Sequence, residues 1–202
     1  MTTPRDLSIA VMDMAPGRRP VEQGDLSLAL AGAEMIDLLG AEAIRLDGDR
    51  IVPGLRPPMA DHLLDEAAAS VIREAPYESV EDWLWRRGRG LSAAYLAALE
   101  AEGQLTRQPR RGMPFRSGRT VLVDSPARRA AADRWTSDEP VLAALAAAIG
   151  IRDDWTGDFP TTADDAVVTV LAAVNDALME LEAVRQRRAI ENAAFDNIWR
   201  GE

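Results

Sequence analysis

An Arg-rich stretch is the part of this sequence best suited to chemistry with an anion. Residues 86–134 hold eleven Arg and four acidic residues, which gives this stretch a formal charge of +7. The rest of the chain has a formal charge of −17, so the net charge of the whole chain is −10. Arg presents a planar fork of donors that matches phosphate and carboxylate, so a shared exposed face of these side chains would bind an anion. Equally, folding can interleave them with the acidic remainder as surface ion pairs. The Arg residues are Arg86, Arg87, Arg89, Arg107, Arg110, Arg111, Arg116, Arg119, Arg128, Arg129 and Arg134.

Residues for covalent or acid–base catalysis are scarce. The chain has one His, no Cys and no Lys, which excludes thiol chemistry, disulfides, Schiff bases and a P-loop lysine. His62 stands at a predicted helix start with no nucleophile motif beside it, so we expect it to face solvent. We therefore predict a protein that is not an enzyme and has no cofactor.

Two further motifs are weak. Asp153, Asp154 and Asp158 approach a helix start at Asp164 and Asp165, but their spacing is not that of a calcium loop, so no metal is expected. A metal-dependent hydrolase or transferase built on this cluster is the enzyme-class alternative. Residues 88–93 match a loose dinucleotide fingerprint, yet a predicted helix precedes them where a strand is required. They indicate instead a helix start beside three Arg, suited to one phosphate group.

Hydrophobic patterning predicts a mainly α fold, a single compact helical domain over 1–202 with one or two β-hairpins. A helix from Asp25 to Leu39 is apolar nearly all round and should be central, ending at Gly40. Ile44–Leu46 and Arg50–Val52 flank an Asp-Gly turn and predict a hairpin. Helices are also expected at 62–74, 80–87, 91–102, 126–135, 140–149 and 163–184, with a helical tail at 185–202. Ser79, Ser125 and Thr162 are the predicted N-caps of the helices that follow them. Residues 6–14 form a short apolar segment in which the alternation of Ile9 and Val11 is typical of a strand.

Residues 91–123 have a winged-helix-like order. The helix at 91–102 precedes two strands, 104–107 and 120–123, that are joined by an Arg-bearing arm at 109–118. Winged helices often bind DNA. The helix at 91–102 carries no Arg or Lys, and the chain is acidic overall. Both features disfavour binding to DNA, so nucleic acid ranks third, after an anionic lipid head and a protein partner.

Compartment and membrane signals are limited. No apolar run reaches the roughly 20 residues that span a bilayer, and 1–13 does not look like a secretory signal. The tail has an apolar stripe of Ile190, Ala194, Phe195, Ile198 and Trp199 mixed with charges, which favours docking on the core or on a second copy over lipid insertion. We expect a cytoplasmic protein, peripheral to a membrane if its anion is a lipid head.

Several motifs resemble the Golgi phosphoprotein 3 family and its bacterial relatives. They are His62-Leu-Leu-Asp-Glu-Ala-Ala, Val80-Glu-Asp-Trp-Leu, and Leu96-Ala-Ala-Leu-Glu-Ala-Glu-Gly-Gln-Leu105, within a similarity over about residues 5–180. The resemblance implies a mainly helical domain with hairpins, no enzymatic activity and, in eukaryotic members, a cationic pocket for phosphatidylinositol 4-phosphate. It also implies a peripheral membrane adaptor that self-associates through a hairpin.

The implied pocket is only partly matched here. The family's Trp and first Arg fall near Glu22 and at Ala31, and its two later basic positions fall on Arg89 and Ser92. The phosphate or lipid-head site is therefore assigned to Arg89 with Arg86 and Arg87, assisted by Arg110 and Arg111. The resemblance places self-association at the 106–123 hairpin, with Thr106, Arg107, Val121 and Val123, and the 185–202 tail is the other route to a homo-oligomer. A scaffold for protein partners that does not bind lipid remains the alternative.

Overall fold

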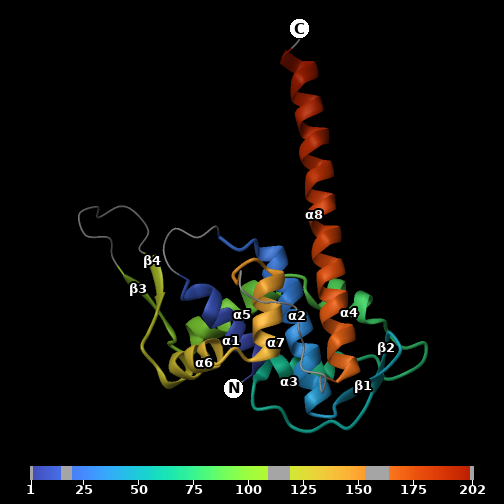
Figure 1. The fold of residues 1–202 in the computed structure, drawn as a ribbon, viewed down its shortest axis with the longest axis vertical. Helices are drawn as coiled ribbons and strands as arrows, with labels where there is room; N and C mark the ends of the chain where they lie inside the picture. Colours follow the sequence, from blue (N-terminus) through green and yellow to red (C-terminus); the bar gives the residue numbers. More distant parts are fainter. Residues whose placement is uncertain (1, 15–19, 109–118, 153–163, 201–202) are drawn as a thin grey trace.

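The computed structural model describes residues 2–14, 20–108, 119–152 and 164–200, without the side chains at 107, 108, 119 and 193–200. These residues form helices and two antiparallel hairpins, which confirms the predicted mainly α fold (Figure 1). The helices are α1 (Thr3–Met12), α2 (Gln23–Gly40), α3 (His62–Ala69), α4 (Val80–Arg87), α5 (Leu91–Ala101), α6 (Pro126–Thr136), α7 (Pro140–Ala148) and α8 (Asp165–Arg200). The strands are β1 (Ile44–Asp47), β2 (Arg50–Pro53), β3 (Leu105–Gln108) and β4 (Arg119–Leu122).

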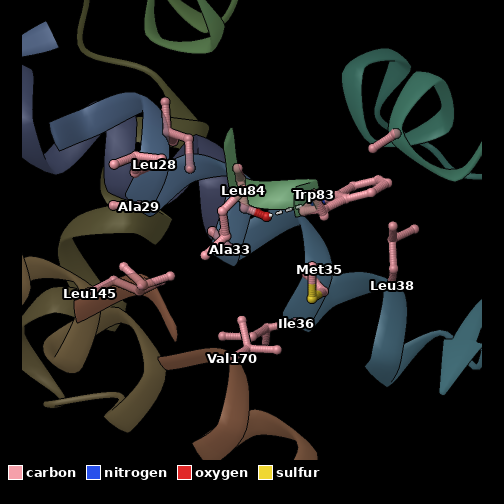
Figure 2. Packing of buried hydrophobic residues seen from close by; sticks show 14 of the residues in the cluster. Leu28, Ala29, Ala33, Met35, Ile36, Leu38, Trp83, Leu84, Leu145 and Val170 are labelled. Carbon is pink, nitrogen blue, oxygen red and sulfur yellow. Dashed lines mark hydrogen bonds between the residues drawn. The ribbon is translucent and has the colours of Figure 1, made fainter. Parts of the chain in front are cut away.

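Helix α2 is the centre of the fold, as its apolar surface predicts. It contacts α1, α3, α4, α5, α7 and α8, and Figure 2 shows Leu28, Met35 and Leu38 of α2 inside the core. Trp83 of α4 is fully buried against it, and the Trp83 indole N–H donates a hydrogen bond of 3.3 Å to the Ala31 carbonyl. A buried indole needs such a partner for its N–H. The bond fixes α4, and the Arg residues that follow, relative to α2.

The first hairpin has the predicted turn. Leu46 pairs with Ile51 and Asp47 with Arg50, and Gly48 takes a φ of +61° between them. Glycine adopts this left-handed conformation without the steric cost that a Cβ imposes. The second hairpin pairs Leu105 with Leu122 and Thr106 with Val121, and its connection at 109–118 lies outside the described residues.

Side-chain caps define several helix starts. The Ser79 hydroxyl accepts a hydrogen bond from Asp82 N–H at 3.0 Å, and the Ser125 hydroxyl accepts one from Arg128 N–H at 3.1 Å. Both caps are predicted from sequence, because a Ser before the first turn satisfies N–H groups that the helix leaves free. The predicted cap of the last helix at Thr162 lies outside the described residues.

Three boundaries differ from the prediction. Residues 3–12 form helix α1 where alternation around Ile9 and Val11 favoured a strand, because Leu7 and Ile9 both face the interior of a helical bundle. Helix α3 ends at Ala69 rather than at Glu74. The last helix and the tail form one continuous helix α8 of 36 residues. Within the described residues, no helix has a segment long and apolar enough to cross a membrane.

Candidate functional site

Arg89 lies in the turn between α4 and α5, at a groove on the surface. Its side chain is exposed and, within the described part of the chain, no carboxylate is paired with it. The groove has a volume of about 340 Å³ and is formed where α2, α4, α5 and α8 meet. Its lining residues are Gln23, Gly24, Ser27, Leu28, Trp85, Gly88, Arg89, Gly90, Ser92, Ala93 and Leu181.

Two glycines shape this turn: Gly88 allows its close approach to α2, and Gly90 allows its left-handed backbone. A Cβ on Gly88 would lie 2.6 Å from the Leu84 carbonyl oxygen and 3.4 Å from the Ser27 carbonyl oxygen, so only glycine allows this approach. Gly90 has a φ of +70° and caps α5 without a side-chain acceptor. The N-terminus of α5 therefore lies at the groove beside Arg89, and the positive end of its helix dipole favours negative charge there.

A pair of serines joins α2 to α5 at the same place. The Ser27 hydroxyl donates to the Ser92 hydroxyl at 3.0 Å and accepts from the Ser92 N–H at 3.1 Å. Ser92 is one of the positions where the family resemblance places a basic residue, and here it supplies a neutral hydroxyl. Nothing in the sequence pairs it with Ser27, 65 residues away.

Arg86 is bound to a carboxylate on another side of α4. Its guanidinium donates to both oxygens of Glu78, at 2.6 and 2.7 Å, and its Cζ lies 5.1 Å from the centroid of the Trp83 ring. The hydrogen bonds that Arg86 donates to the Glu78 carboxylate raise the pKa of Arg86. The arrangement holds Arg86 to the protein rather than presenting all its donors to a ligand.

Arg87 is part of a buried polar network. It donates to both Glu34 oxygens at 2.7 and 2.9 Å and to the Leu63 carbonyl at 2.9 Å, while the Tyr95 hydroxyl donates to Glu34 at 3.0 Å. The Glu34 side chain is fully buried, and burial raises the pKa of its carboxyl although Arg87 opposes that change. Arg86, Arg87 and Arg89 thus lie close in sequence but have separate environments.

The described Arg residues later in the stretch are also paired. Arg128 meets Asp13 at 2.5 Å, Arg129 meets Asp124 at 3.0 Å, and Arg134 meets Asp6 at 2.5 Å. For these three, and for Arg86 and Arg87, the interleaved alternative is the one observed. The side chains of Arg107, Arg110, Arg111, Arg116 and Arg119 lie outside the description, so their part in a site stays a prediction.

The residues assigned to self-association lie where the second hairpin begins. Thr106 of β3 is exposed and pairs with the half-buried Val121 of β4, while Leu105 and Leu122 face inward. The Val123 N–H donates to the Gln104 carbonyl at 2.8 Å, and the Arg107 backbone pairs with Thr120. The hairpin is thus present, and its role in self-association stays a prediction.

The single His of the sequence lies at the start of α3. The His62 side chain is 83% exposed and lies 3.5 Å from Glu66 in the next turn of α3. Within the described residues, no group of three or more potential metal ligands is brought together. Asp153, Asp154 and Asp158 lie outside the description.

The fold and the groove define a class: a helical protein with two small hairpins and an exposed cation beside a helix start. The family model of Golgi phosphoprotein 3 (GPP34) matches residues 4–193, so the chain belongs to the Golgi phosphoprotein 3 family. No individual curated protein matches the sequence.

Proposed function

We propose that this protein is a non-catalytic adaptor that binds an anionic phosphate group, in particular a phosphoinositide-type lipid head, in the Arg89 groove. The observation that carries the proposal is the exposed Arg89 beside the N-terminus of α5, in a groove that Ser27 and Ser92 also line. The Arg89 guanidinium and the Ser92 hydroxyl can donate hydrogen bonds to a phosphate monoester, and the positive end of the helix dipole adds favourable potential. The protein then acts in the cytoplasm, at the surface of a membrane.

The contributions of the neighbouring Arg residues differ in this proposal. Arg89 contacts the head directly, while Arg86 and Arg87 contribute less because Glu78 and Glu34 balance their charges. Arg110 and Arg111, which follow β3 in the sequence, assist as further positive charges that strengthen attraction to an anionic surface. Self-association through Thr106, Arg107, Val121 and Val123 would increase membrane affinity by joining several such sites.

Vesicle flotation tests the lipid proposal. The protein is mixed with neutral phosphatidylcholine vesicles, with vesicles containing phosphatidylserine, and with vesicles containing phosphatidylinositol 4-phosphate at matched charge. We expect the strongest binding to the last, and Arg89→Ala to weaken it by roughly ten- to a hundredfold, since a charge-assisted hydrogen bond contributes about 1.5–3 kcal/mol. Arg129→Ala removes the same charge from an exposed pair with Asp124 and serves as the matched control.

Two results would contradict the lipid proposal. One is equal binding to neutral and anionic vesicles. The other is undiminished binding after Arg89→Ala is combined with Arg86→Ala. Either result would favour the second candidate, a scaffold for protein partners that does not bind lipid, which the pairing of Arg86 and Arg87 with carboxylates supports. Retention on duplex DNA with a steep salt dependence would instead favour the winged-helix alternative.

A further inference from the structure

Helix α8 carries a line of exposed apolar side chains on its outer face. Val168, Met179 and Ile190 are 39%, 72% and 70% exposed, and consecutive members lie eleven residues apart. Three turns of an α-helix take about 10.8 residues, so residues eleven apart lie almost in a straight line. Ala172 and Ala183, both exposed, follow Val168 and Met179 by four residues each on the same face. We call these five residues the outer stripe.

The outer stripe faces away from the rest of the protein. Val170, Val174 and Ala177 lie on the opposite side of α8 and are buried against the body. The last described ion pair between α8 and α2 joins Arg185 to Asp25 at 2.7 Å. From Gln186 to Asn192 all side chains are exposed, and Figure 1 shows the C-terminal half of α8 extending beyond the other elements. A projecting helix of this length is marginal in water unless something packs on it.

We propose that the outer stripe is a dimer interface, on which α8 of a second copy of this chain packs in the antiparallel direction. Two copies of the outer stripe fit together when they run in opposite directions. If the two-fold axis passes through residue 181, Met179 packs against Ala183 of the other copy, and Ala172 packs against Ile190 of the other copy. Met179 and Ile190 then each face an alanine, which lets the two helices pack closely. Self-complementarity of this kind is what a two-fold symmetric interface requires.

Charge also favours the antiparallel direction. Asp176 and Arg187 are exposed on the same flank of the outer stripe. In the antiparallel register, Arg187 of one copy comes within one residue position of Asp176 of the other, at both ends of the contact. Glu180 and Glu182 of the two copies meet near the axis, where Glu182 already accepts a hydrogen bond from Gln186 at 3.0 Å and lies 3.7 Å from Arg185. A parallel pair would place Asp176 beside Asp176, and Met179 beside Met179.

A groove beside the outer stripe extends the proposed interface. It is lined by Met179, Ala183 and Gln186 of α8 together with Ile149 after α7 and Asp25 of α2, and its volume is about 670 Å³. Side chains on the flank of a second α8 reach this groove while the body of each copy stays behind its own helix. The two bodies therefore lie on opposite sides of the helix pair.

Sedimentation equilibrium over a range of concentrations tests the dimer. We expect the full chain to dimerise, and Met179→Glu with Ile190→Glu to raise the dissociation constant at least about a hundredfold, because both charges would be buried in an apolar contact. Leu55→Glu with Leu96→Glu changes the charge equally at exposed positions away from α8 and should leave the constant unchanged. All four positions are exposed, so circular dichroism should show folded chains. A monomeric wild-type chain, or a dimer that survives the α8 substitutions, would overturn the proposal.

Cysteine crosslinking tests the direction, since the chain has no Cys of its own. A mixture of an Ala172→Cys chain and an Ile190→Cys chain should form a disulfide between the two variants on mild oxidation. Each variant alone should stay uncrosslinked, because residue 172 lies far from residue 172 of the other copy. Crosslinking within each variant alone would show a parallel pair and overturn the antiparallel register. The result is independent of the Arg89 groove, because neither position lines it.

Discussion

At the scale of single residues, the buried Glu34–Arg87–Tyr95 network is a consequence of folding that local sequence does not reveal. Glu34 lies on the central helix α2, among apolar residues that share its burial. Its charge is tolerated there because Arg87 and Tyr95 supply donors to both carboxylate oxygens. Arg87 is thereby held in the structure, and Arg89 is left facing solvent.

Replacing Glu34 with Gln tests this network. The substitution leaves the partly buried Arg87 without its anionic partner, so we expect a loss of about 3 kcal/mol in the free energy of unfolding, measured by urea denaturation. Asp124→Asn breaks the exposed pair with Arg129 and should cause no measurable loss. Equal losses in the free energy of unfolding for the two substitutions would show that the buried Glu34–Arg87 pair stabilises the fold no more than an exposed pair does.

Asp37 should make stability fall as the pH rises. It accepts hydrogen bonds from the Thr3 N–H at 2.8 Å and the Thr3 hydroxyl at 2.7 Å, yet burial raises the pKa of its carboxyl above the ordinary 3.8. Above pH 3.8 the unfolded chain loses this proton while the folded chain keeps it. The group therefore contributes stability at low pH that is lost as the pH rises through the raised folded value.

Asp37→Asn checks this sign. Urea midpoints are measured from about pH 4 to about pH 7 for both chains, a range that spans ordinary carboxyl titration. The stability of the wild type relative to the variant should decrease as the pH rises. A relative stability that increases with pH would mean that the Thr3 hydrogen bonds outweigh burial and that the folded pKa is lowered.

At the scale of elements, glycines decide how closely helices approach. A Cβ on Gly32 of α2 would lie 2.4 Å from Cγ2 of Val174 on α8, whereas a Cβ on Gly40 would meet nothing within 4 Å. The sequence places both Gly32 and Gly40 in one helix without distinguishing their roles. Their different roles come from the helix packed against one of them.

Alanine at the two glycines should therefore have opposite effects. Gly32→Ala overpacks the contact between α2 and α8 and should cost about 1–3 kcal/mol in the free energy of unfolding. Gly40→Ala adds a helix-favouring residue at an open position and should stabilise by up to about 1 kcal/mol. Thermal and urea unfolding of both variants measure the difference, and stabilisation by Gly32→Ala would show that Val174 moves aside at little cost.

At the scale of the whole molecule, the core has two parts of very different size. The large cluster gathers around α2 and includes Trp83, while the small one consists of Ile9, Leu99, Leu105, Leu122 and Ala131 beneath the second hairpin. A region held by few buried contacts opens more readily than the main core. The hairpin assigned to self-association is thus expected to open more readily than the main core.

Hydrogen exchange followed by mass spectrometry checks that difference. Amides of β3 and β4 should exchange faster than those of α2, and Leu122→Ala should speed exchange in the hairpin further while α2 remains unchanged. A matched substitution in the large cluster, Leu145→Ala, should lower protection throughout. Uniform loss of protection in Leu122→Ala would show that both clusters unfold as one unit.

Local patterns in the sequence determine much of this fold. Capping serines, the Asp-Gly turn and the apolar surface of residues 25–39 predict the helix starts at Val80 and Pro126, the first hairpin and the central helix. Each is a short-range effect, since a cap or turn depends on residues within one helical turn. Helix α1 was not predicted, because alternation in a short apolar segment does not distinguish a strand from a helix that is buried on several sides.

The sequence by itself determined the family, the mainly helical class and the position of Arg89 before a helix. Tertiary structure alone decided which Arg residues are paired. Glu34 reaches Arg87 only once α2 packs against α4, and Glu78 reaches Arg86 only once the segment before α4 folds back on that helix. It also decided that the groove unites Ser27 with Ser92, and that one face of α8 stays uncovered. Such contacts depend on distances between segments far apart in the chain, and no local pattern specifies them.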